Sequence, residues 1–228
     1  MSELQAGKLP LDVNTLGCDL LSLSGHKMYA PKGVGALFVR RHLPLTPLFF
    51  GGPHERQRRA GTENVPGIVA LGAAADLASS WLANGRSPDR RHDSPTHLAA
   101  LRDRLESGLL SAIHHSGING AGQPRTPNTL NLYFEGVDAE SLVIALDLKG
   151  ISVSGGSACQ SGATEPSHVL TAMRLSDARA RSSIRISLSR LTTLADVDQV
   201  LNILPETVAR LRKLPSPAQP RPGSFVSA

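Results

Sequence analysis

The sequence predicts an α/β protein, because strand-like and helix-like segments alternate along the chain and no internal repeat is present. The strand-like segments are residues 18–24, 34–40, 129–135, 151–153 and 182–189. The helix-like segments are residues 65–82, 98–113, 139–148 and 193–211.

The composition of the 228 residues limits the class of protein. Hydrophobic residues make up 40% of the chain, which suffices for a globular core. The chain has no run of about 18 apolar residues, so we expect no membrane partner. Its start, MSELQAGKLP, lacks the apolar core of a secretory signal. Two cysteines are too few for a disulfide framework and favour a cytoplasmic location.

The net charge of +5 raises the question of nucleic-acid binding. Apart from residues 54–59 and 85–92, the basic residues are scattered along the chain. Aromatic residues make up only 4%, so few side chains are available to stack on bases. We therefore expect no nucleic-acid partner, and we expect the basic residues to attract an anionic cofactor or substrate.

The first half of the chain is predicted to hold a short sheet and a long helix. Residues 18–24 favour a buried strand that begins at Cys18, which we place in the core. A turn signal at residues 31–33 separates this strand from the one at 34–40. The alanine-rich helix at 65–82 is expected to be buried on most sides.

A change in composition predicts the domain organisation. Residues 84–95 are polar and contain a glycine and two prolines, which indicates a boundary between domains. We assign residues 1–86 to a first domain and residues 87–213 to a second. Residues 214–228 are rich in proline and are predicted to form a disordered tail.

The second domain carries local signals for helix positions. Asp138 can cap a helix that Gly150 closes. Thr193 and Asp196 form a capping-box pattern at the start of the last helix, and Pro205 is predicted to kink that helix. The apolar face of the helix at 98–113 is predicted to consist of Leu98, Leu101, Leu105, Leu109 and Ile113.

The first candidate site is the run Ser24-Gly25-His26-Lys27, directly after a strand. A lysine amine can form a Schiff base with a carbonyl cofactor. Ser24 and His26 are donors suited to a phosphate, and Gly25 would let the backbone approach a ligand closely. The alternative is a surface turn with a solvated lysine.

The second candidate is Cys159, which stands in a loop of glycine, serine and alanine at residues 154–162. Such surroundings are typical of an exposed, reactive thiol, because buried structural cysteines have apolar neighbours. The alternative is an incidental exposed cysteine.

The third candidate is Arg185, in the strand at 182–189. A guanidinium binds a carboxylate through two parallel hydrogen bonds. The alternative is an arginine on the solvated face of the strand, because Arg185 alternates with Ile184 and Ile186.

Taken together, four segments resemble the cysteine desulfurases of the NifS/IscS type, which are class-V members of the aminotransferase-like pyridoxal-phosphate enzymes. The segments are SLSGHKMYAPKGVGALFVRR, GGPHERQRRAGTENVPGIVALG, GISVSGGSACQSGATEPSHVLTAM and RSSIRISLSRLTT, in the family's order. The resemblance covers about residues 6–213. The implied fold is the C-terminal part of a fold-type I large domain, followed by a small α/β C-terminal domain that carries the cysteine loop.

The resemblance implies pyridoxal 5'-phosphate as the cofactor. Lys27 matches the lysine that holds the cofactor covalently. Ser24 and His26 match ligands of its phosphate. Thr62 matches a threonine that reaches the phosphate in the partner subunit of a homodimer.

The resemblance also implies the substrate and the reaction. Arg185 matches the arginine that binds the α-carboxylate of L-cysteine. Cys159 matches the cysteine that takes the sulfur as a persulfide, with L-alanine as the other product. The implied partners are iron–sulfur scaffold or thiolation proteins that accept the sulfur. The implied metal chemistry is limited to a transient iron–sulfur contact at Cys159.

The sequence departs from the family ahead of Gly7. The family has a D-A-x-Q pattern there, with an aspartate beneath the pyridine nitrogen, whereas this chain has MSELQA and supplies no aspartate. About half of the family's chain precedes this point. We therefore expect an N-terminally truncated chain with little or no turnover on its own. The alternatives are an inactive partial fragment, or a related enzyme such as a selenocysteine lyase.

Overall fold

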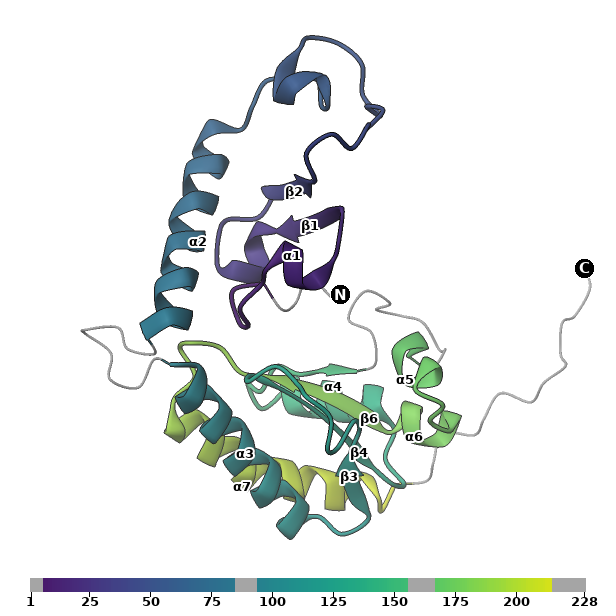
Figure 1. Ribbon diagram of the computed structural model, residues 1–228. Helices are drawn as coiled ribbons and strands as arrows, with labels where there is room; N and C mark the ends of the chain where they lie inside the picture. The colour runs from purple at the N-terminus through teal and green to yellow at the C-terminus, as the bar shows by residue number, and fades with distance from the viewer. Residues whose placement is uncertain (1–5, 85–93, 156–166, 215–228) are drawn as a thin grey trace, which may run out of the picture. The chain divides into compact units, whose positions relative to one another are not determined.

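The computed structural model describes residues 6–84, 94–155 and 167–214. The chain divides into two compact units, residues 1–97 and residues 98–228 (Figure 1), and each is described by itself. Both units combine helices with strands, so the predicted α/β class is confirmed. The predicted tail after residue 214 lies outside the described residues.

The first unit contains a two-stranded antiparallel sheet. β1 (Leu20–Ser24) pairs with β2 (Gly35–Val39), so that Leu20 lies opposite Val39 and Ser24 opposite Gly35. The remaining elements are α1 (Val13–Leu16), the 3-10 turns η2 (Gly25–Met28) and η3 (His54–Gln57), and α2 (Val65–Asn84). Both predicted strands and the long helix are therefore confirmed.

The predicted burial of β1 and Cys18 is wrong for the structure described. β1 is exposed or half-buried along its length, and Leu20 is 45% exposed. Cys18 lies ahead of β1 and is half-buried, and it is not part of a core. The physical reason is that burial of a strand requires elements packed on the faces of its sheet, and the elements of this unit cover the two-stranded sheet only in part.

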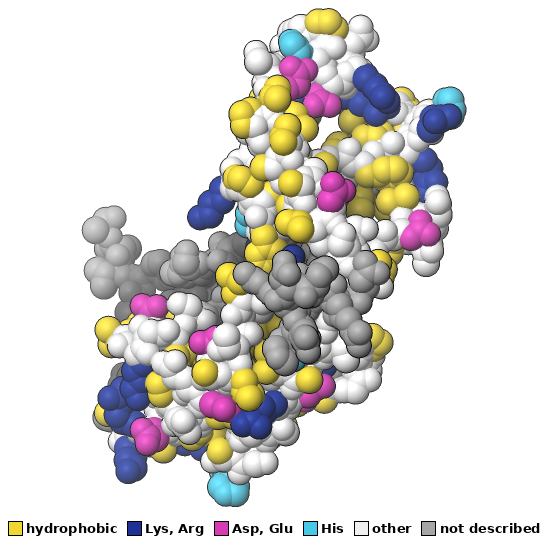
Figure 2. All heavy atoms as spheres, turned by 90° about the vertical axis from the view of Figure 1, so that its left-hand side faces the viewer, with side chains coloured by type: hydrophobic (Ala, Val, Ile, Leu, Met, Phe, Trp, Pro, Cys, Tyr) yellow, Lys and Arg dark blue, Asp and Glu magenta, His cyan; other side chains and the backbone are white. Residues whose placement is uncertain are grey.

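Helix α2 is also less buried than the sequence suggested. The Asn64 side chain caps its start by accepting a hydrogen bond from the Gly67 N–H at 3.1 Å. Its buried residues are Gly67, Ala74 and Trp81, which recur every seven residues and form one narrow stripe. The exposed apolar side chains include Val65, Ile68, Val69 and Leu77. In Figure 2, hydrophobic side chains accordingly gather over this helix.

Residues Val65–Ala83 of α2 are long and apolar enough, by length and composition, to cross a membrane. No other helix of the described ranges meets this criterion. Core helices of globular domains also meet it, so the finding is weak support for a membrane span.

The second unit is built on a four-stranded antiparallel sheet in the order β3-β4-β6-β5. Its strands are β3 (Ser116–Ile118), β4 (Thr129–Phe134), β5 (Ser154–Gly155) and β6 (Ser183–Ser187). Its helices are α3 (Pro95–Ala112), α4 (Ala139–Asp147), α5 (His168–Ala172), α6 (Asp177–Arg181) and α7 (Leu194–Leu211). The strand predicted at 151–153 is displaced, because in the described part of this segment residues 154 and 155 are the ones that pair with β6.

One face of this sheet forms the core of the second unit. Along β4, Leu130, Leu132 and Phe134 are buried and alternate with half-buried residues. α3 and α7 run along the sheet in Figure 1. They lie so close together that a Cβ atom added to Gly108 would come within 2.5 Å of Leu201. All five residues of the predicted apolar face of α3 are buried: Leu98, Leu101, Leu105, Leu109 and Ile113.

The predicted helix caps are confirmed. The Asp138 carboxylate accepts a hydrogen bond from the Ser141 N–H at 2.9 Å, and Gly150 has the left-handed φ of 76° that closes such a helix. Thr193 and Asp196 form both hydrogen bonds of a capping box. Pro205 lies within α7.

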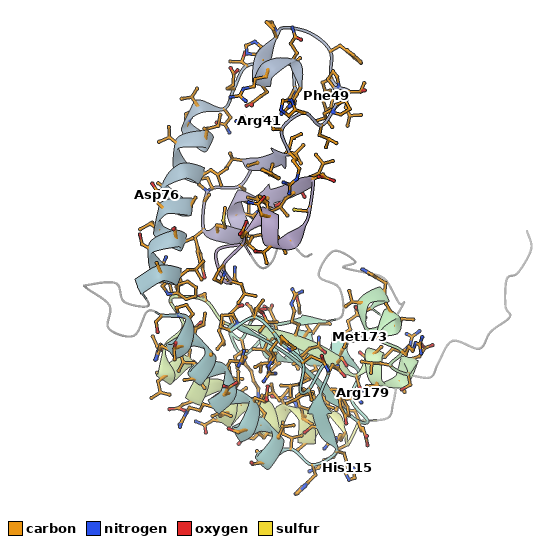
Figure 3. All side chains as sticks on the ribbon, viewed as in Figure 1. Arg41, Phe49, Asp76, His115, Met173 and Arg179 are labelled. Atoms are coloured by element: carbon orange, nitrogen blue, oxygen red, sulfur yellow. The ribbon has the colours of Figure 1, made fainter. Side chains whose placement is uncertain are left out.

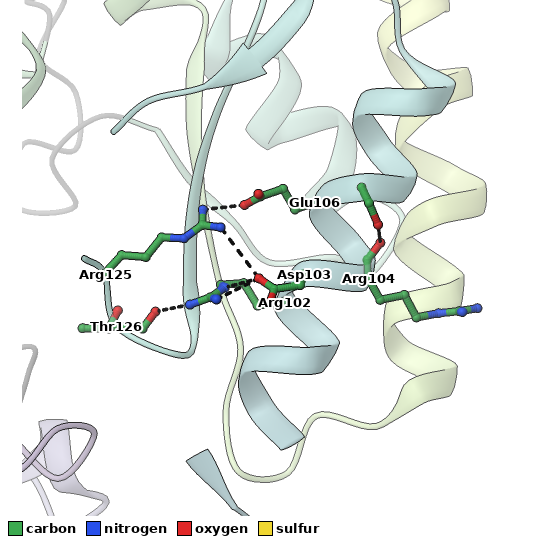
Figure 4. Close-up of polar contacts among 7 residues, drawn as sticks. Arg102, Asp103, Arg104, Glu106, Arg125 and Thr126 are labelled. Carbon is green, nitrogen blue, oxygen red and sulfur yellow. Dashed lines mark hydrogen bonds and ion pairs between the residues drawn. The ribbon is translucent and has the colours of Figure 1, made fainter. Parts of the chain in front are cut away.

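A network of charged side chains ties the connection between β3 and β4 to α3 (Figure 4). The buried Arg102 donates hydrogen bonds to the Thr126 carbonyl at 2.8 Å and to the Asp103 carboxylate at 2.7 Å. Arg125 pairs with Glu106, and this pairing raises the pKa of Arg125. These contacts hold the segment that leads into β4, the strand next to Arg185.

Candidate active site

Ser24, His26 and Lys27 lie in one tight turn. Ser24 is the last residue of β1 and has extended backbone, and η2 begins at the next residue. The turn closes when the Ala30 N–H donates to the Gly25 carbonyl at 3.1 Å. Ser24 and Lys27 are half-buried and His26 is exposed. The turn therefore presents a hydroxyl, an imidazole and an amine within four residues.

Glycine at position 25 is required by packing within the chain. The Gly25 N–H donates to the Val34 carbonyl at 2.9 Å. A Cβ atom at position 25 would lie 2.8 Å from that same carbonyl oxygen, which is closer than real contacts allow. The sequence predicted close approach to a ligand here, whereas the structure shows close approach to the chain segment that enters β2.

We expect Gly25→Ala to destabilise the first unit by about 1–3 kcal/mol, because backbone must move to make room for the methyl group. Urea unfolding of the chain measures this loss. Gly72→Ala is the matched control: nothing lies within 4 Å of a Cβ atom at position 72 in α2, and alanine is the better helix former. Equal stability of the two variants would contradict the packing role of Gly25.

Lys8 is a neighbour of the turn that the sequence analysis did not single out. Its Nζ atom donates to the Lys27 carbonyl at 2.8 Å and lies 5.7 Å from the Tyr29 ring centroid. Burial, and then the charge of Lys27, lower the pKa of Lys8 below its ordinary value. The run Gly7-Lys8-Leu9-Pro10 was the available signal, but its spacing alone gives no partner for the lysine.

Lys8 lies beside η2 because Gly7, the residue before it, packs closely against this unit. Gly7 has a left-handed φ of 71°, and a Cβ atom there would lie 3.2 Å from Met28 and 3.3 Å from Ala78 of α2. Two lysines thus meet at one turn, which suits an anionic group.

Thr62 lies apart from this turn within the same unit. It is exposed and precedes α2. The next residue, Glu63, pairs with His54 at 2.8 Å, and the hydrogen bond from His54 lowers the pKa of the Glu63 carboxyl. The turn packs near Ala78, which is about 20 Å along the helix from Val65 at 1.5 Å per residue. The structure therefore does not bring Thr62 next to Lys27.

Arg185 lies in the centre of the second sheet, opposite Asn131 of β4 and Ser154 of β5. Ile184 and Ile186 point to the core, so Arg185 belongs to the other face. Its Nη2 atom donates to the Ser154 hydroxyl at 3.4 Å, a long bond. Its Nε atom is buried and finds no hydrogen-bond acceptor in the described part of the chain.

A buried donor without an acceptor is costly. The buried Nε atom therefore favours an Arg185 that binds an anion over the alternative of a solvated side chain.

Cys159 lies outside the described residues, between β5 and α5. Gly155, the last described residue before it, pairs with Ile184, the neighbour of Arg185 in β6. The first unit thus carries Ser24, His26 and Lys27, and the second carries Arg185. Within residues 6–84, 94–155 and 167–214, no three histidine, cysteine or acidic side chains gather as a metal site would require.

Comparison with known proteins identifies the family. Residues 4–200 match the model of the aminotransferase class-V family. The chain belongs to that family. Among curated relatives of this class-V chain, the cysteine desulfurase of Gluconacetobacter diazotrophicus is 49% identical over 210 residues. The IscS cysteine desulfurase of Methanosarcina thermophila is 47% identical over 215 residues, and the NifS of Azotobacter vinelandii 43% over 208.

These matches cover 91%, 94% and 91% of the class-V chain, in that order, and 50% of each relative. The chain thus spans about half the length of the curated relatives it matches. Solved structures agree on the fold. A NifS-like protein matches with a TM-score of 0.76 and 33% identity over 90% of this chain and 50% of its own. The NifS-like protein from Rickettsia africae matches with a TM-score of 0.76 and 31% identity, over 90% and 51%.

Proposed function

We propose that this class-V chain carries the lysine, arginine and cysteine of a cysteine desulfurase. In the reaction, L-cysteine gives L-alanine, and its sulfur is transferred as a persulfide. The observation that carries the proposal is the turn Ser24–Lys27, built by a chain that is 49% identical to a cysteine desulfurase along 91% of its length.

The donors of the turn fit pyridoxal 5'-phosphate. Lys27 would hold the cofactor's aldehyde carbon covalently, and Ser24 and His26 would donate to its phosphate. Lys8 adds a second cation beside this turn, which favours an anionic ligand. When bound, the cofactor supplies an electron sink for breaking bonds at the substrate's Cα.

The chain's own residues would then perform three tasks. Arg185 binds the substrate's α-carboxylate through its guanidinium. The Lys27 amine would move the proton at Cα. The Cys159 thiolate attacks the substrate's sulfur, so that a sulfur–sulfur bond forms as the carbon–sulfur bond breaks, and the electron pair left on carbon takes up a proton to give alanine.

Partners follow from this chemistry. A protein-bound persulfide is passed on by thiol exchange, so the acceptors would be iron–sulfur scaffold or thiolation proteins. The span of about 20 Å along α2 between Ala78 and Val65 supports a homodimer in which Thr62 serves the cofactor phosphate of the neighbouring subunit. We also propose a cytoplasmic location, which the two cysteines of the chain support.

The proposal is tested in a hybrid in which this chain replaces the matching half of the Gluconacetobacter diazotrophicus cysteine desulfurase. We expect the hybrid, supplied with pyridoxal phosphate, to release alanine from L-cysteine. Amino-acid analysis measures the alanine, and L-selenocysteine serves as the rival substrate. If a folded hybrid holds the cofactor but releases alanine only from L-selenocysteine, L-cysteine is the wrong substrate and selenocysteine takes its place.

Arg185→Ala in the same hybrid should raise the KM for L-cysteine at least about tenfold, because a charged hydrogen bond is worth about 1.5–3 kcal/mol. Cofactor absorbance should stay unchanged, since the lost contact is to the substrate. Arg181→Ala, an exposed arginine at the end of α6, is the control. An unchanged KM in Arg185→Ala would mean that Arg185 serves the sheet alone.

A further inference from the structure

A chain of hydrogen bonds crosses the polar face of the second sheet and ends next to Arg185. It begins at Arg179 of α6, labelled in Figure 3, whose guanidinium lies 4.1 Å from the centroid of the Tyr133 ring. Arg179 donates from Nη2 to the Ile118 carbonyl at 2.9 Å and from Nε to Asn119 Oδ1 at 2.7 Å. These contacts fix the guanidinium in one place.

Arg179 determines the orientation of the next two amides. A guanidinium can only donate, so the Asn119 atom facing it must be the oxygen. The Asn119 Nδ2 atom then donates to Asn131 Oδ1 at 2.6 Å and to the Ser183 hydroxyl at 2.8 Å. Asn119 and Ser183 are both buried, which leaves little room for another arrangement.

The orientation of Asn131 follows from this chain. Its oxygen is taken by Asn119, so its two N–H groups point away from Asn119. Asn131 is half-buried, so these N–H groups are not sealed inside the core and are open to a ligand. Asn131 lies directly opposite Arg185 in the pairing of β4 with β6. The Cβ atoms of such a pair are about 4.5–5.5 Å apart on the same face of the sheet.

Two donor groups therefore stand side by side. Arg185 has a buried Nε atom with no acceptor among the described residues and one long bond to Ser154. Asn131 adds a neutral amide at its side. A carboxylate accepts up to about four hydrogen bonds, so one carboxylate can take both.

We propose that Asn131 is a second ligand of the substrate's α-carboxylate, beside Arg185. Asn119 and Arg179 act as positioning residues, because they hold the Asn131 amide with its nitrogen toward the carboxylate. The inference rests on the proposed role of Arg185 and adds a contact to it. A reversed Asn131 amide would present its oxygen to the carboxylate and repel it.

Nuclear magnetic resonance of the whole chain tests the ligand role. L-cysteine is titrated while the Arg185 Nε–H and Asn131 Nδ2 signals are followed, with cysteamine, which lacks only the carboxylate, as the control compound. We expect L-cysteine to shift both signals and cysteamine to shift neither. If only Arg185 shifts, the inference is wrong and the proposed function stands. If neither shifts, the carboxylate role of both residues is wrong, while alanine release by the hybrid still tests the proposed reaction separately.

Asn131→Thr removes the amide with a residue that suits a strand. We expect it to weaken L-cysteine binding about tenfold, the effect of one lost hydrogen bond to a charged group. Thr129→Ser, two residues along the same face of β4, is the matched control and should bind normally. Equal affinity in Asn131→Thr and the wild type overturns the inference.

The positioning role is tested at Arg179 itself. Arg179→Lys keeps a group that only donates, so the direction of the hydrogen-bond chain and the affinity for L-cysteine should survive. Arg179→Gln introduces an amide that can also accept a hydrogen bond, so the Asn119 and Asn131 amides can reverse. The affinity for L-cysteine should then fall several-fold, with about tenfold as the largest expected loss. If Arg179 had a purely structural role, Arg179→Lys would not be expected to bind L-cysteine more tightly than Arg179→Gln does. Equal binding by both folded variants would exclude the positioning role.

Discussion

Replacing Lys27 with alanine should abolish covalent attachment of pyridoxal phosphate at the turn after β1. The wild-type hybrid, incubated with pyridoxal phosphate and reduced with borohydride, should carry a pyridoxyl group on the Lys27 peptide. Mass spectrometry of the peptides measures that label. The expected loss is complete at this position, because alanine has no amine to react with the aldehyde.

Lys8 is the strictest control for this experiment. Burial and the charge of Lys27 lower its pKa, so at a given pH a larger fraction of Lys8 is neutral than for an ordinary lysine, and neutral amines react with aldehydes. Lys8→Met should leave the label on Lys27. If the pyridoxyl label persists in Lys27→Ala and is lost in Lys8→Met, then Lys8 and not Lys27 is the lysine that holds the cofactor.

Ser24→Ala should have an effect between those of Lys27→Ala and Lys8→Met. It would remove the proposed hydrogen bond to the phosphate, worth about 1.5–3 kcal/mol, and should weaken cofactor binding about tenfold or more while the label stays on Lys27.

Features with a local cause could be predicted from the sequence. The alternation of β4 places Leu130, Leu132 and Phe134 on one face whatever surrounds the strand. The caps at Asp138 and Thr193 depend on side chains within three residues of the helix start. Such signals require no knowledge of which element packs against which.

Features that depend on distant neighbours could not be predicted. The apolar composition of α2 suggested burial on most sides, but burial requires a covering element, and this unit covers only the stripe of Gly67, Ala74 and Trp81. The contact of Lys8 with the Lys27 carbonyl joins residues 19 positions apart. The hydrogen bond from Arg179 to Asn119 spans 60 positions. No spacing rule connects such pairs.

The segment before α2 has left-handed backbone at residues that carry side chains. Gln57 has a left-handed φ of 64°. Glu55 and Arg56 before it have φ values of 48° and 57°. Left-handed backbone disfavours side chains with a Cβ atom, so this segment is strained, and the pair between His54 and Glu63 helps to hold it in place.

Each unit carries its own group of donors. In the first unit, Lys8 and Lys27 meet at a turn suited to a phosphate and an aldehyde. In the second, Arg185 and its neighbours on the polar face suit a carboxylate. Each unit thus provides donors for a different anionic group, while the proposed sulfur chemistry depends on Cys159.

Replacing Cys159 with serine should stop sulfur transfer without affecting the cofactor. In the proposed reaction the thiolate would act on the substrate's sulfur only after the substrate is bound, so Cys159→Ser in the hybrid should still carry the pyridoxyl label on Lys27. Its absorbance should still respond to L-cysteine. Alanine release should fall to the background level measured without the protein, because a serine hydroxyl is a far weaker nucleophile toward sulfur than a thiolate.

The second cysteine of the chain is the internal control for the persulfide. With limiting L-cysteine and no reductant, the wild-type hybrid should gain one sulfur atom on the Cys159 peptide and none on the Cys18 peptide, as measured by mass spectrometry. Cys18 lies in an anchored segment: Arg40 donates to its carbonyl at 2.9 Å and pairs with Asp19 at 3.0 Å. A thiol held there cannot follow a substrate. Sulfur found on Cys18, or alanine released at the wild-type rate by Cys159→Ser, would contradict the proposed role of Cys159 as the sulfur acceptor.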